Sequence, residues 1–259
     1  MNLRFDFRQA LRAAGRLVCL LSLALAGMAS SAGAEEAQQA VDSDPFEGFN
    51  RKIFWFNETV DEYLLEPVAK GWDWATPELV RDSLERFFEN LKVPVVTVNS
   101  LLQGKPTDAG VGLARFLFNS TVGFAGFFDP AQSELGLKPV REDFGQTLGV
   151  WGIENAPYLV LPLLGPSTPR DAIGSGIDGF MAVYPYFVPA VYLYGAQGLD
   201  VVNSRARLLV PIADSRKAAL DYYVFVRNAY LQYRRALVND QELPAGGADE
   251  DLYQIIPGN

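Results

Sequence analysis

Hydrophobic residues recur at steps of three or four over much of the chain, which is the spacing of helices with one apolar face. The first series has five such positions: Phe49, Ile53, Phe56, Val60 and Leu64. It predicts a helix that ends at Pro67, because proline removes a helical hydrogen bond. A second series, Val80, Leu84, Phe87 and Leu91, predicts a helix that ends near Pro94.

A third series predicts a long helix near the end of the chain, over about residues 215–239. Its apolar positions are Leu220, Val224, Tyr230, Leu231 and Leu237. Arg227, Arg234 and Arg235 lie between them, and we expect these three side chains on the face that meets water. Strand alternation is weak, although residues 158–164 fit an extended or hairpin-like piece around Pro162. The pattern as a whole predicts a mainly α fold.

Four sites carry an acceptor side chain directly before a proline, an arrangement that starts many helices. They are Asp44-Pro45, Thr76-Pro77, Asp129-Pro130 and Thr168-Pro169. The Asp or Thr oxygen can accept a hydrogen bond from the first turn, and proline lacks an N–H group that would otherwise have no partner there. Glu47, three residues after Asp44, completes a capping box at the first site. Four such starts strengthen the prediction of a helical protein.

Three apolar stretches stand out from this helical pattern: residues 111–128, 156–168 and 179–199. The first carries one charge, Arg115, and the other two carry none. Glycine, proline or asparagine interrupts all three, so none fits an unbroken transmembrane helix. We interpret them as surfaces that lie partly in lipid or enclose a lipid-like ligand, and burial in a large core is the alternative for each stretch.

The third stretch is nominally long enough to span a bilayer, but Pro185, Pro189 and Gly195 lie inside it with four tyrosines. Proline kinks a helix and tyrosine prefers the membrane–water interface, so we expect a broken, half-inserted pair of helices. In residues 116–128, five phenylalanines accompany Gly123 and Gly126. These glycines indicate close backbone approach or a break, in a helix that is buried, faces lipid or lines a channel.

The first 34 residues resemble a secretion signal, with four arginines, an apolar region at 17–26 and Ala32-Gly33-Ala34 at the end. Cleavage after Ala34 would make Glu35 the first mature residue. The apolar region is too short to span a bilayer, and a retained N-terminal anchor is the alternative. Cys19 fits a lipid-attachment site poorly, because Arg16 stands where an apolar residue is wanted and the apolar region follows the cysteine.

Composition narrows the classes of function. The chain has 259 residues and a net charge of −9, which loss of the signal would make more negative, so nucleic acid is not an expected partner. Membrane contact would have to be mainly apolar. There is no histidine, and the only cysteine lies in the signal, which excludes His-dependent triads, thiol chemistry and disulfides from the mature chain. We expect no cofactor and no metal site.

We expect one folded domain after the signal peptide at 1–34. Residues 35–43 are predicted to be a flexible polar lead, and residues 44–239 form the helical domain, because no long linker or repeat divides them. Residues 240–259, rich in Gly, Pro and acids, are predicted to be a disordered acidic tail.

Four motifs, in order along residues 44–238, resemble those of the VacJ/MlaA family. The first is Asp44-Pro-Phe-Glu-Gly-Phe-Asn-Arg51, and the second is the Gly-rich segment over residues 115–129. The third block combines Phe144-Gly-Gln-Thr-Leu-Gly-Val-Trp-Gly152 with residues 157–171. Asn203-Ser-Arg-Ala206 and the long last helix follow in the expected order. One motif alone would be weak, but four in order are a specific signal.

The resemblance implies a single-domain, ring-like helical bundle with a central amphipathic channel, partly embedded in the inner leaflet of the outer membrane on its periplasmic side. It implies intermembrane transport that removes mislocalised phospholipids from the outer leaflet, passes them to a periplasmic lipid-carrier protein and so maintains lipid asymmetry. It also implies a trimeric porin as partner. Family members are lipoproteins, and this chain departs from that pattern at Cys19. A porin-associated envelope scaffold that transports nothing is the alternative.

We expect apolar residues along the channel for acyl chains and a few polar groups for the headgroup. The candidate lipid contacts are Phe116, Phe118, Gly123, Gly126, Phe127, Phe128, Tyr158, Leu161, Leu163 and Arg170. Arg170, near a helix start, is the candidate phosphate contact, and an ion pair with Asp171 is its alternative role. Asp129 fits an N-cap better than a gate, and Asn50 and Asn119 could equally satisfy buried backbone groups.

A hydrolase is the remaining class. Glu142 and Asp143 are adjacent carboxylates, and glycosidases use a pair of such groups. Adjacent residues on a helix do not face each other, so we assign no catalytic residue and do not expect an enzyme.

Overall fold

The computed structural model describes residues 44–153 and 157–241. The signal with Cys19, the cleavage site at Ala34 and Glu35, the lead at 35–43 and residues 242–259 of the tail lie outside this range. Contacts divide the chain into Met1–Pro45 and Phe46–Asn259, and the fold below is that of the second part. The predicted mainly helical fold is confirmed, and the predicted limits of the domain stay predictions.

Helices make up most of the fold. The first elements are α2 (Glu47–Val60), a π-helical turn (Asp61–Leu65), α3 (Glu66–Ala75) and α4 (Glu78–Leu102). They are followed by α5 (Pro106–Thr121), α6 (Pro130–Ser133) and α7 (Phe144–Val150). After the strands β1 (Leu159–Leu161) and β2 (Gly165–Ser167) come α8 (Pro169–Met181), a 3₁₀ turn (Tyr184–Tyr186), α9 (Ala190–Arg207), α10 (Leu209–Ala218) and α11 (Tyr222–Val238).

The strands form a hairpin, one of the two forms that the sequence allows around Pro162. β1 and β2 are antiparallel, with Leu159 opposite Ser167 and Leu161 opposite Gly165. Along the described parts of the chain, these two strands are the whole β-structure.

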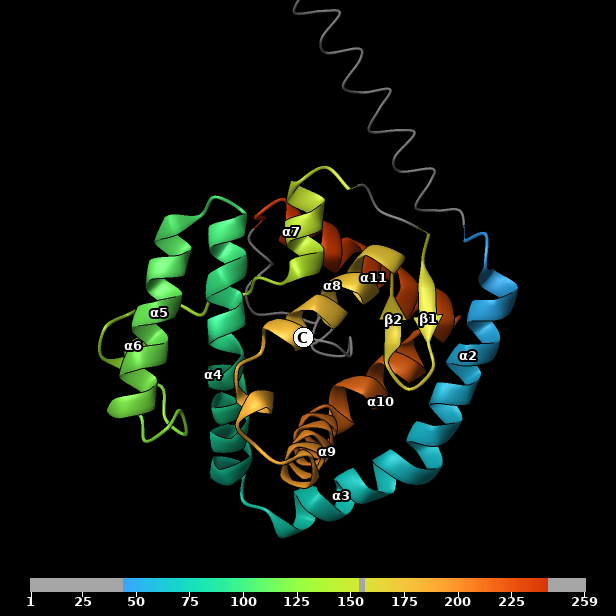
Figure 1. The fold of residues 1–259 in the computed structure, drawn as a ribbon. Coiled ribbons are helices and arrows are strands. Elements are labelled where there is room, and N and C mark those ends of the chain that lie inside the picture. The colour runs from blue at the N-terminus through green and yellow to red at the C-terminus, as the bar shows by residue number, and fades with distance from the viewer. Residues whose placement is uncertain (1–43, 154–156, 242–259) are drawn as a thin grey trace, which may run out of the picture. The chain divides into compact units, whose positions relative to one another are not determined.

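The elements close a circuit of contacts. α2 contacts β1, β2 contacts α11, α11 contacts α7 and α7 contacts α4. The chain itself joins α4 through α3 and the π-helical turn back to α2 (Figure 1). α9 packs against α3 and α4, and α5 with α6 forms a lobe on α4 outside the circuit. This arrangement agrees with the expected ring-like bundle.

Within residues 44–153 and 157–241, no helix is both long enough and apolar enough to cross a bilayer.

Neither Pro67 nor Pro94 ends a helix, which corrects two predicted boundaries. Pro67 lies in the first turn of α3, directly after the π-helical turn, where the backbone N–H of Glu66 donates to the Asp61 carbonyl. This wider turn joins α2 to α3 without a break. Pro94 lies inside α4, between buried Phe88 and buried Asn99. Packing of both halves of α4 therefore outweighs the hydrogen bond that proline removes.

Two of the four predicted helix caps are confirmed. Asp129 accepts a hydrogen bond from the backbone N–H of Gln132 at 3.1 Å, at the start of α6. Thr168 accepts one from the N–H of Asp171 at 3.1 Å, at the start of α8. Asp129 is thus an N-cap, as expected.

The other two starts are correct only in position. α2 has Phe46 as its N-cap and α4 has Pro77, and neither helix has a side-chain cap bond. Thr76 instead ends α3, where its N–H donates to the carbonyl of Trp72 at 2.9 Å.

The predicted helix over residues 215–239 is in fact two helices, α10 and α11. α11 begins after Asp221, whose side chain accepts from the N–H of Val224 at 3.2 Å. Leu220, predicted on the apolar face, lies in the break and is fully exposed. Arg227 and Arg234, predicted to face water, are both buried. Partners supplied by other helices explain the burial of Arg234, as described below.

The core lies where α2, the hairpin and α11 meet. Tyr158 packs against Tyr223 and Tyr230, with ring centroids 6.1 Å apart in both pairs, and Phe54 lies 5.5 Å from Tyr223. Asn50 is fully buried beside them. Its amide donates to the Tyr158 carbonyl and accepts from the N–H of Val160, both at 3.0 Å. Asn50 therefore satisfies buried backbone groups, one of the two roles considered for it.

Candidate functional site

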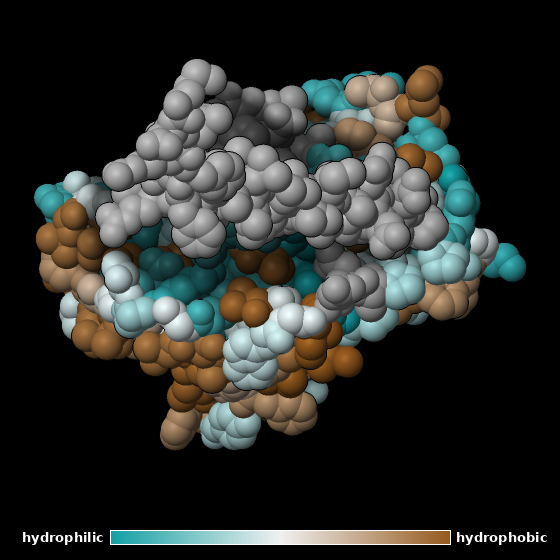
Figure 2. Space-filling model, turned by 90° about the horizontal axis from the view of Figure 1, so that it is seen from above, coloured by the Kyte–Doolittle hydropathy of each residue, from teal (hydrophilic) through white to brown (hydrophobic). Residues whose placement is uncertain are grey.

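The surface is hollowed when it is seen from above (Figure 2). Where the hollow is visible, hydrophilic and hydrophobic residues lie side by side on its wall. Such a wall can contact both a polar group and hydrocarbon, which is what an amphipathic ligand requires.

Apart from Arg170 of α8, the candidate lipid contacts fall into two groups that lie apart. One group occupies α5 and the loop after it, in the lobe, and the other occupies the hairpin on the opposite side of the circuit (Figure 1). Within the lobe, Phe116 and Phe118 are half-buried on α5. Phe127 stacks on Phe87 of α4 with ring centroids 4.8 Å apart, and Phe128 is exposed.

A buried ion pair closes the lobe. Asp129 accepts from Arg115 at 2.7 Å and from the Asn119 amide at 2.9 Å. The Asn119 oxygen in turn accepts from the N–H of Ala131 at 3.0 Å, so this side chain satisfies a buried backbone group. The single charge of the first apolar stretch, Arg115, therefore fixes the loop that follows α5.

The two glycines of this loop are packed rather than open to a channel. A Cβ atom on Gly123 would lie 2.5 Å from the carbonyl oxygens of Asn119 and Phe128. Gly126 has φ +95°, and its Cβ would lie 2.6 Å from the Cβ of Asn90. A charged side chain at either position would thus disrupt the loop before it could obstruct a lipid path.

The hairpin presents an apolar tip. Tyr158 is in the core and Leu161 is half-buried, but Leu163 and Leu164 are each 67% exposed. Leu163 has φ +64°, a left-handed conformation that leucine rarely adopts. Exposure and strain at the same residue indicate a functional position more strongly than either would alone.

Two asparagines of α2 hold this hairpin. Besides the bonds of Asn50, the Asn57 amide donates to the Leu161 carbonyl at 2.9 Å and accepts from the N–H of Leu163 at 2.8 Å. Asn57 thus bonds to the strained residue directly. The hairpin is positioned by side chains of a helix, on its edge away from β2.

Arg170 lies inside the fold, only 5% exposed. Its Nε donates to Asp171 at 3.1 Å, and Asp171 also accepts from Tyr230 at 2.7 Å and Arg234 at 2.8 Å. Burial raises the pKa of Asp171, but the positive charges of Arg234 and Arg170 outweigh it, so the pKa lies below its usual value. Asp171 stays ionised, and Arg170 is part of its charge balance.

A second charge network lies at the π-helical turn, and sequence reasoning missed it. Arg205 of α9 donates to both oxygens of Asp61, at 2.7 and 2.9 Å. Arg216 of α10 reaches Asp61 and Glu58, both at 2.8 Å. The residues of the Arg205–Asp61 pair are 144 positions apart, so no local pattern could reveal it.

The adjacent carboxylates Glu142 and Asp143 have separate partners. Glu142 accepts from Lys105 and Gln103, both at 2.9 Å. Asp143 accepts from Arg234 at 2.9 Å and caps α7. Burial raises the pKa of Glu142, whereas Arg234 overcomes burial and lowers the pKa of Asp143. Both groups are occupied in fixing the fold.

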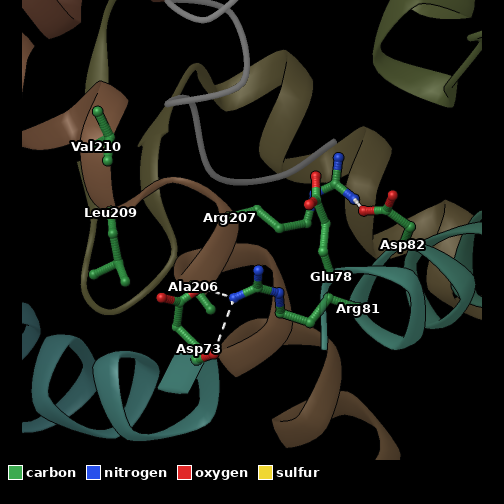
Figure 3. A pocket seen from close by; sticks show the side chains of 8 residues that line it. All are labelled: Asp73, Glu78, Arg81, Asp82, Ala206, Arg207, Leu209 and Val210. Atoms are coloured by element: carbon green, nitrogen blue, oxygen red, sulfur yellow. Dashed lines mark hydrogen bonds and ion pairs between the residues drawn. The ribbon is translucent and has the colours of Figure 1, made fainter. Parts of the chain in front are cut away.

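One pocket, of 260 Å³, lies between the α3–α4 turn and the start of α10 (Figure 3). Two ion pairs cross its wall: Arg207 donates to Asp82 at 2.7 Å, and Arg81 bonds Asp73. Both guanidinium groups already have carboxylate partners. The pocket therefore offers no uncommitted cation to an anionic ligand.

A larger pocket, of 700 Å³, lies between α4 and the lobe. It is lined by Arg86, Val122, Phe128, Asp129, Pro130, Gln132 and Ser133. Among the candidate lipid contacts, Phe128 belongs to it.

The third apolar stretch forms a broken pair of helices, as predicted: α8 ends at Met181 and α9 begins at Ala190. Large apolar and aromatic side chains are exposed around this break. They are Phe180, Tyr186, Phe187, Val191, Tyr192 and Tyr194. A surface of this kind is typical of contact with lipid or with another protein.

Fold and site together define a class: a mainly helical protein whose elements close a circuit of contacts, with an amphipathic hollow on one face and aromatic residues exposed at a helix break. A family model described as MlaA lipoprotein matches residues 42–237. The chain belongs to this family, and the predicted resemblance is confirmed.

Relatives and a solved structure agree. The Intermembrane phospholipid transport system lipoprotein MlaA of Haemophilus influenzae is 35% identical, over 88% of this chain and 91% of that protein. The protein of the same name from Escherichia coli is 37% identical, over 85% and 86%. A structure titled "Structural basis for maintenance of bacterial outer membrane lipid asymmetry" matches with a TM-score of 0.68 and 34% identity, over 76% of this chain and 100% of that one.

Proposed function

We propose that this chain takes part in intermembrane phospholipid transport, as the names of its relatives state for them. It removes mislocalised phospholipids from the outer leaflet of the outer membrane and passes them to a periplasmic carrier, which maintains lipid asymmetry. The observation that carries the proposal is identity of 35% and 37% to such proteins over most of each chain. Transport needs no covalent step, so the proposal includes no enzymatic activity.

The proposed lipid path is an amphipathic channel that uses the exposed members of the candidate set. Leu163 at the hairpin tip and Phe128 in the lobe can contact acyl chains directly. Leu161, Phe116 and Phe118 are half-buried and contribute less area. Tyr158, Gly123, Gly126 and Phe127 act by holding the hairpin and the loop in shape. Arg170 could meet a phosphate only where its pair with Asp171 opens.

The exposed aromatic residues around the break between α8 and α9 support a position in the inner leaflet of the outer membrane. Insertion of these tyrosine and phenylalanine side chains into a lipid interface is favourable, by about 25 cal/mol for each Å² of apolar surface removed from water. A trimeric porin at the membrane and a periplasmic lipid-carrier protein complete the proposed set of partners.

Complementation tests the transport proposal. The gene is deleted, and phospholipid exposed on the outer leaflet is measured with the wild-type gene, Leu163→Asp or Leu220→Asp restored. Aspartate tolerates the left-handed conformation of residue 163 better than leucine does, so the substitution adds a charge without adding strain. Leu220→Asp is the matched control, because Leu220 is fully exposed and is not among the candidate lipid contacts.

The wild-type gene and Leu220→Asp should restore low exposure of phospholipid, and Leu163→Asp should fail at a normal protein level. If Leu163→Asp fully restored low exposure of phospholipid, the hairpin tip would not be part of the lipid path. The scaffold alternative predicts the opposite pattern, in which Leu163→Asp is harmless and substitutions of exposed Phe187 and Tyr192 abolish function.

A further inference from the structure

Arg86 is a loosely paired cation in the larger pocket. Its guanidinium lies 3.8 Å from the Asp82 carboxylate, and 37% of its side chain is exposed. Asp82 makes the shorter contact with Arg207, at 2.7 Å. Asp129, the other charged residue of the pocket wall, is bonded to Arg115 inside the lobe. The pocket therefore presents a guanidinium whose donors are mostly uncommitted.

Two large apolar side chains of a fixed loop share the pocket with this cation. Val122 and Phe128 line the pocket and are 62% and 55% exposed, and Phe124 of the same loop is also exposed. Phe127 anchors the loop by stacking on Phe87, the neighbour of Arg86 in α4. Because the loop cannot fold these side chains inward, their exposure is built into the lobe.

A cation beside an apolar rim matches the part of a phospholipid where the phosphate meets the acyl chains. Guanidinium groups bind phosphate oxygens bidentately, and 700 Å³ is a normal volume for a small-molecule site. We propose that the lobe pocket binds one phospholipid, with its phosphate on Arg86 and the upper part of its chains on Val122 and Phe128. This inference rests on the proposed function, since it takes phospholipid as the ligand.

The site shares Phe128 with the proposed lipid path and differs from that path in its cation, Arg86 of α4, which is not among the candidate lipid contacts. It also differs from the 260 Å³ pocket. In the smaller pocket both arginines already have carboxylate partners. A lipid bound to Arg86 would hold the lobe at the level of the lipid headgroups in the membrane. An acidic peptide could satisfy Arg86 but has no need of the apolar rim, so the lipid explains more of the site.

Photo-crosslinking tests the site. The full chain in maltoside detergent is irradiated with a phosphatidylethanolamine that carries a diazirine near the glycerol end of one acyl chain. Mass spectrometry then counts adducts in residues 122–133. Arg86→Gln should lower this labelling about tenfold, the effect of losing a charge-assisted hydrogen bond, while Arg86→Lys keeps most of it. Arg141→Gln is the matched control, because Arg141 is also exposed and lies outside the pocket.

Competitors separate the sources of the phosphate. Dihexanoylphosphatidylcholine should displace the probe from residues 122–133, and equal concentrations of inorganic phosphate or dihexanoylglycerol should not. Equal displacement by inorganic phosphate would show a simple ion site and overturn the inference. Stronger displacement by a synthetic acidic peptide would assign the pocket to a protein partner and overturn it too. Unchanged labelling of Arg86→Gln would overturn the inference, and so would a loss of labelling in Arg141→Gln as large as that in Arg86→Gln.

The same variants keep this inference separate from the proposed function. If the wild-type gene restores lipid asymmetry but Arg86→Gln labels normally, only the lobe site is wrong. If the wild-type gene does not restore asymmetry, the transport proposal is wrong, and the labelling of purified protein still decides the site. Thermal unfolding of Arg86→Gln should match the wild type, because the Arg86 side chain is partly exposed and loosely paired.

Discussion

The first and third apolar stretches, 111–128 and 179–199, look alike in composition and differ in structure. In the first, Arg115 and Asp129 form a buried pair that fixes the loop, and Gly126 has no room for a side chain. In the third there is no charged side chain, and a Cβ on Gly179 or Gly195 would meet nothing within 4 Å. Its aromatic residues lie exposed around a helix break.

The difference shows what turns an apolar stretch into a defined loop. A buried charge must be paired, so Arg115 dictates where the chain goes after α5. The glycines then allow the backbones to approach. Without such a requirement, the third stretch is free to direct its aromatic residues outward. The first stretch therefore holds a few exposed apolar side chains on a fixed loop, and the third forms a broad apolar surface.

Loss of the buried pair should have the largest effect on stability. Arg115→Met leaves the Asp129 carboxylate in a partly buried site without its cation, so the free energy of unfolding should fall by about 3 kcal/mol or more. Chemical denaturation in detergent measures the change, with Arg141→Gln as control. A loss below about 1 kcal/mol would mean that the pair does not hold the loop.

A methyl group in the fixed loop should have the next largest effect. Gly126→Ala forces alanine to φ +95° and brings its Cβ against Asn90, so we expect a loss of about 2 kcal/mol. The measurement is the denaturation midpoint. A midpoint equal to that of the wild type would show that the loop can move aside.

The matched substitution in the third stretch should have the opposite sign. Gly195→Ala places a methyl group in open space inside α9, and alanine favours the helix by about 0.5–1 kcal/mol over glycine. The melting temperature should rise slightly. A fall as large as that of Gly126→Ala would reveal a packing partner for this face of α9, and the comparison would fail.

Removal of exposed aromatic residues should change stability least. Phe187→Ser with Tyr192→Ser should alter the free energy of unfolding by no more than about 0.5 kcal/mol, because both side chains are exposed. Binding to liposomes, measured by co-sedimentation, should weaken several-fold. Val210→Ser, another exposed apolar residue, is the control on α10. If the double variant bound liposomes as well as the wild type does, this surface would not be a membrane contact.

Local chemistry made part of the fold predictable. The caps at Asp129 and Thr168 and the hairpin around Pro162 depend on neighbouring residues, and all three are found. The predicted ends at Pro67 and Pro94 failed, because a π-helical turn and burial along α4 override the local preference of proline.

The candidate site was predictable only in outline. The sequence pointed to the hairpin and to residues 116–128, and it singled out Arg115 as the one charge of that stretch. It placed Arg234 in water, because its partners Asp143 and Asp171 come from other helices. No sequence pattern identified Arg86 as a candidate either. Whether a charged side chain is ion-paired or free to bind a ligand depends on its tertiary neighbours, which the periodicity of the sequence does not encode.

The two asparagines of α2 have one more consequence. A β-strand at the edge of a sheet offers its backbone to any other strand, and this is a common route to aggregation. Along β1, Asn50 and Asn57 occupy the carbonyls of Tyr158 and Leu161 and the N–H groups of Val160 and Leu163. The β1 edge of this hairpin is thus closed to foreign strands, and the chain can expose leucine at the tip without inviting self-association through that edge.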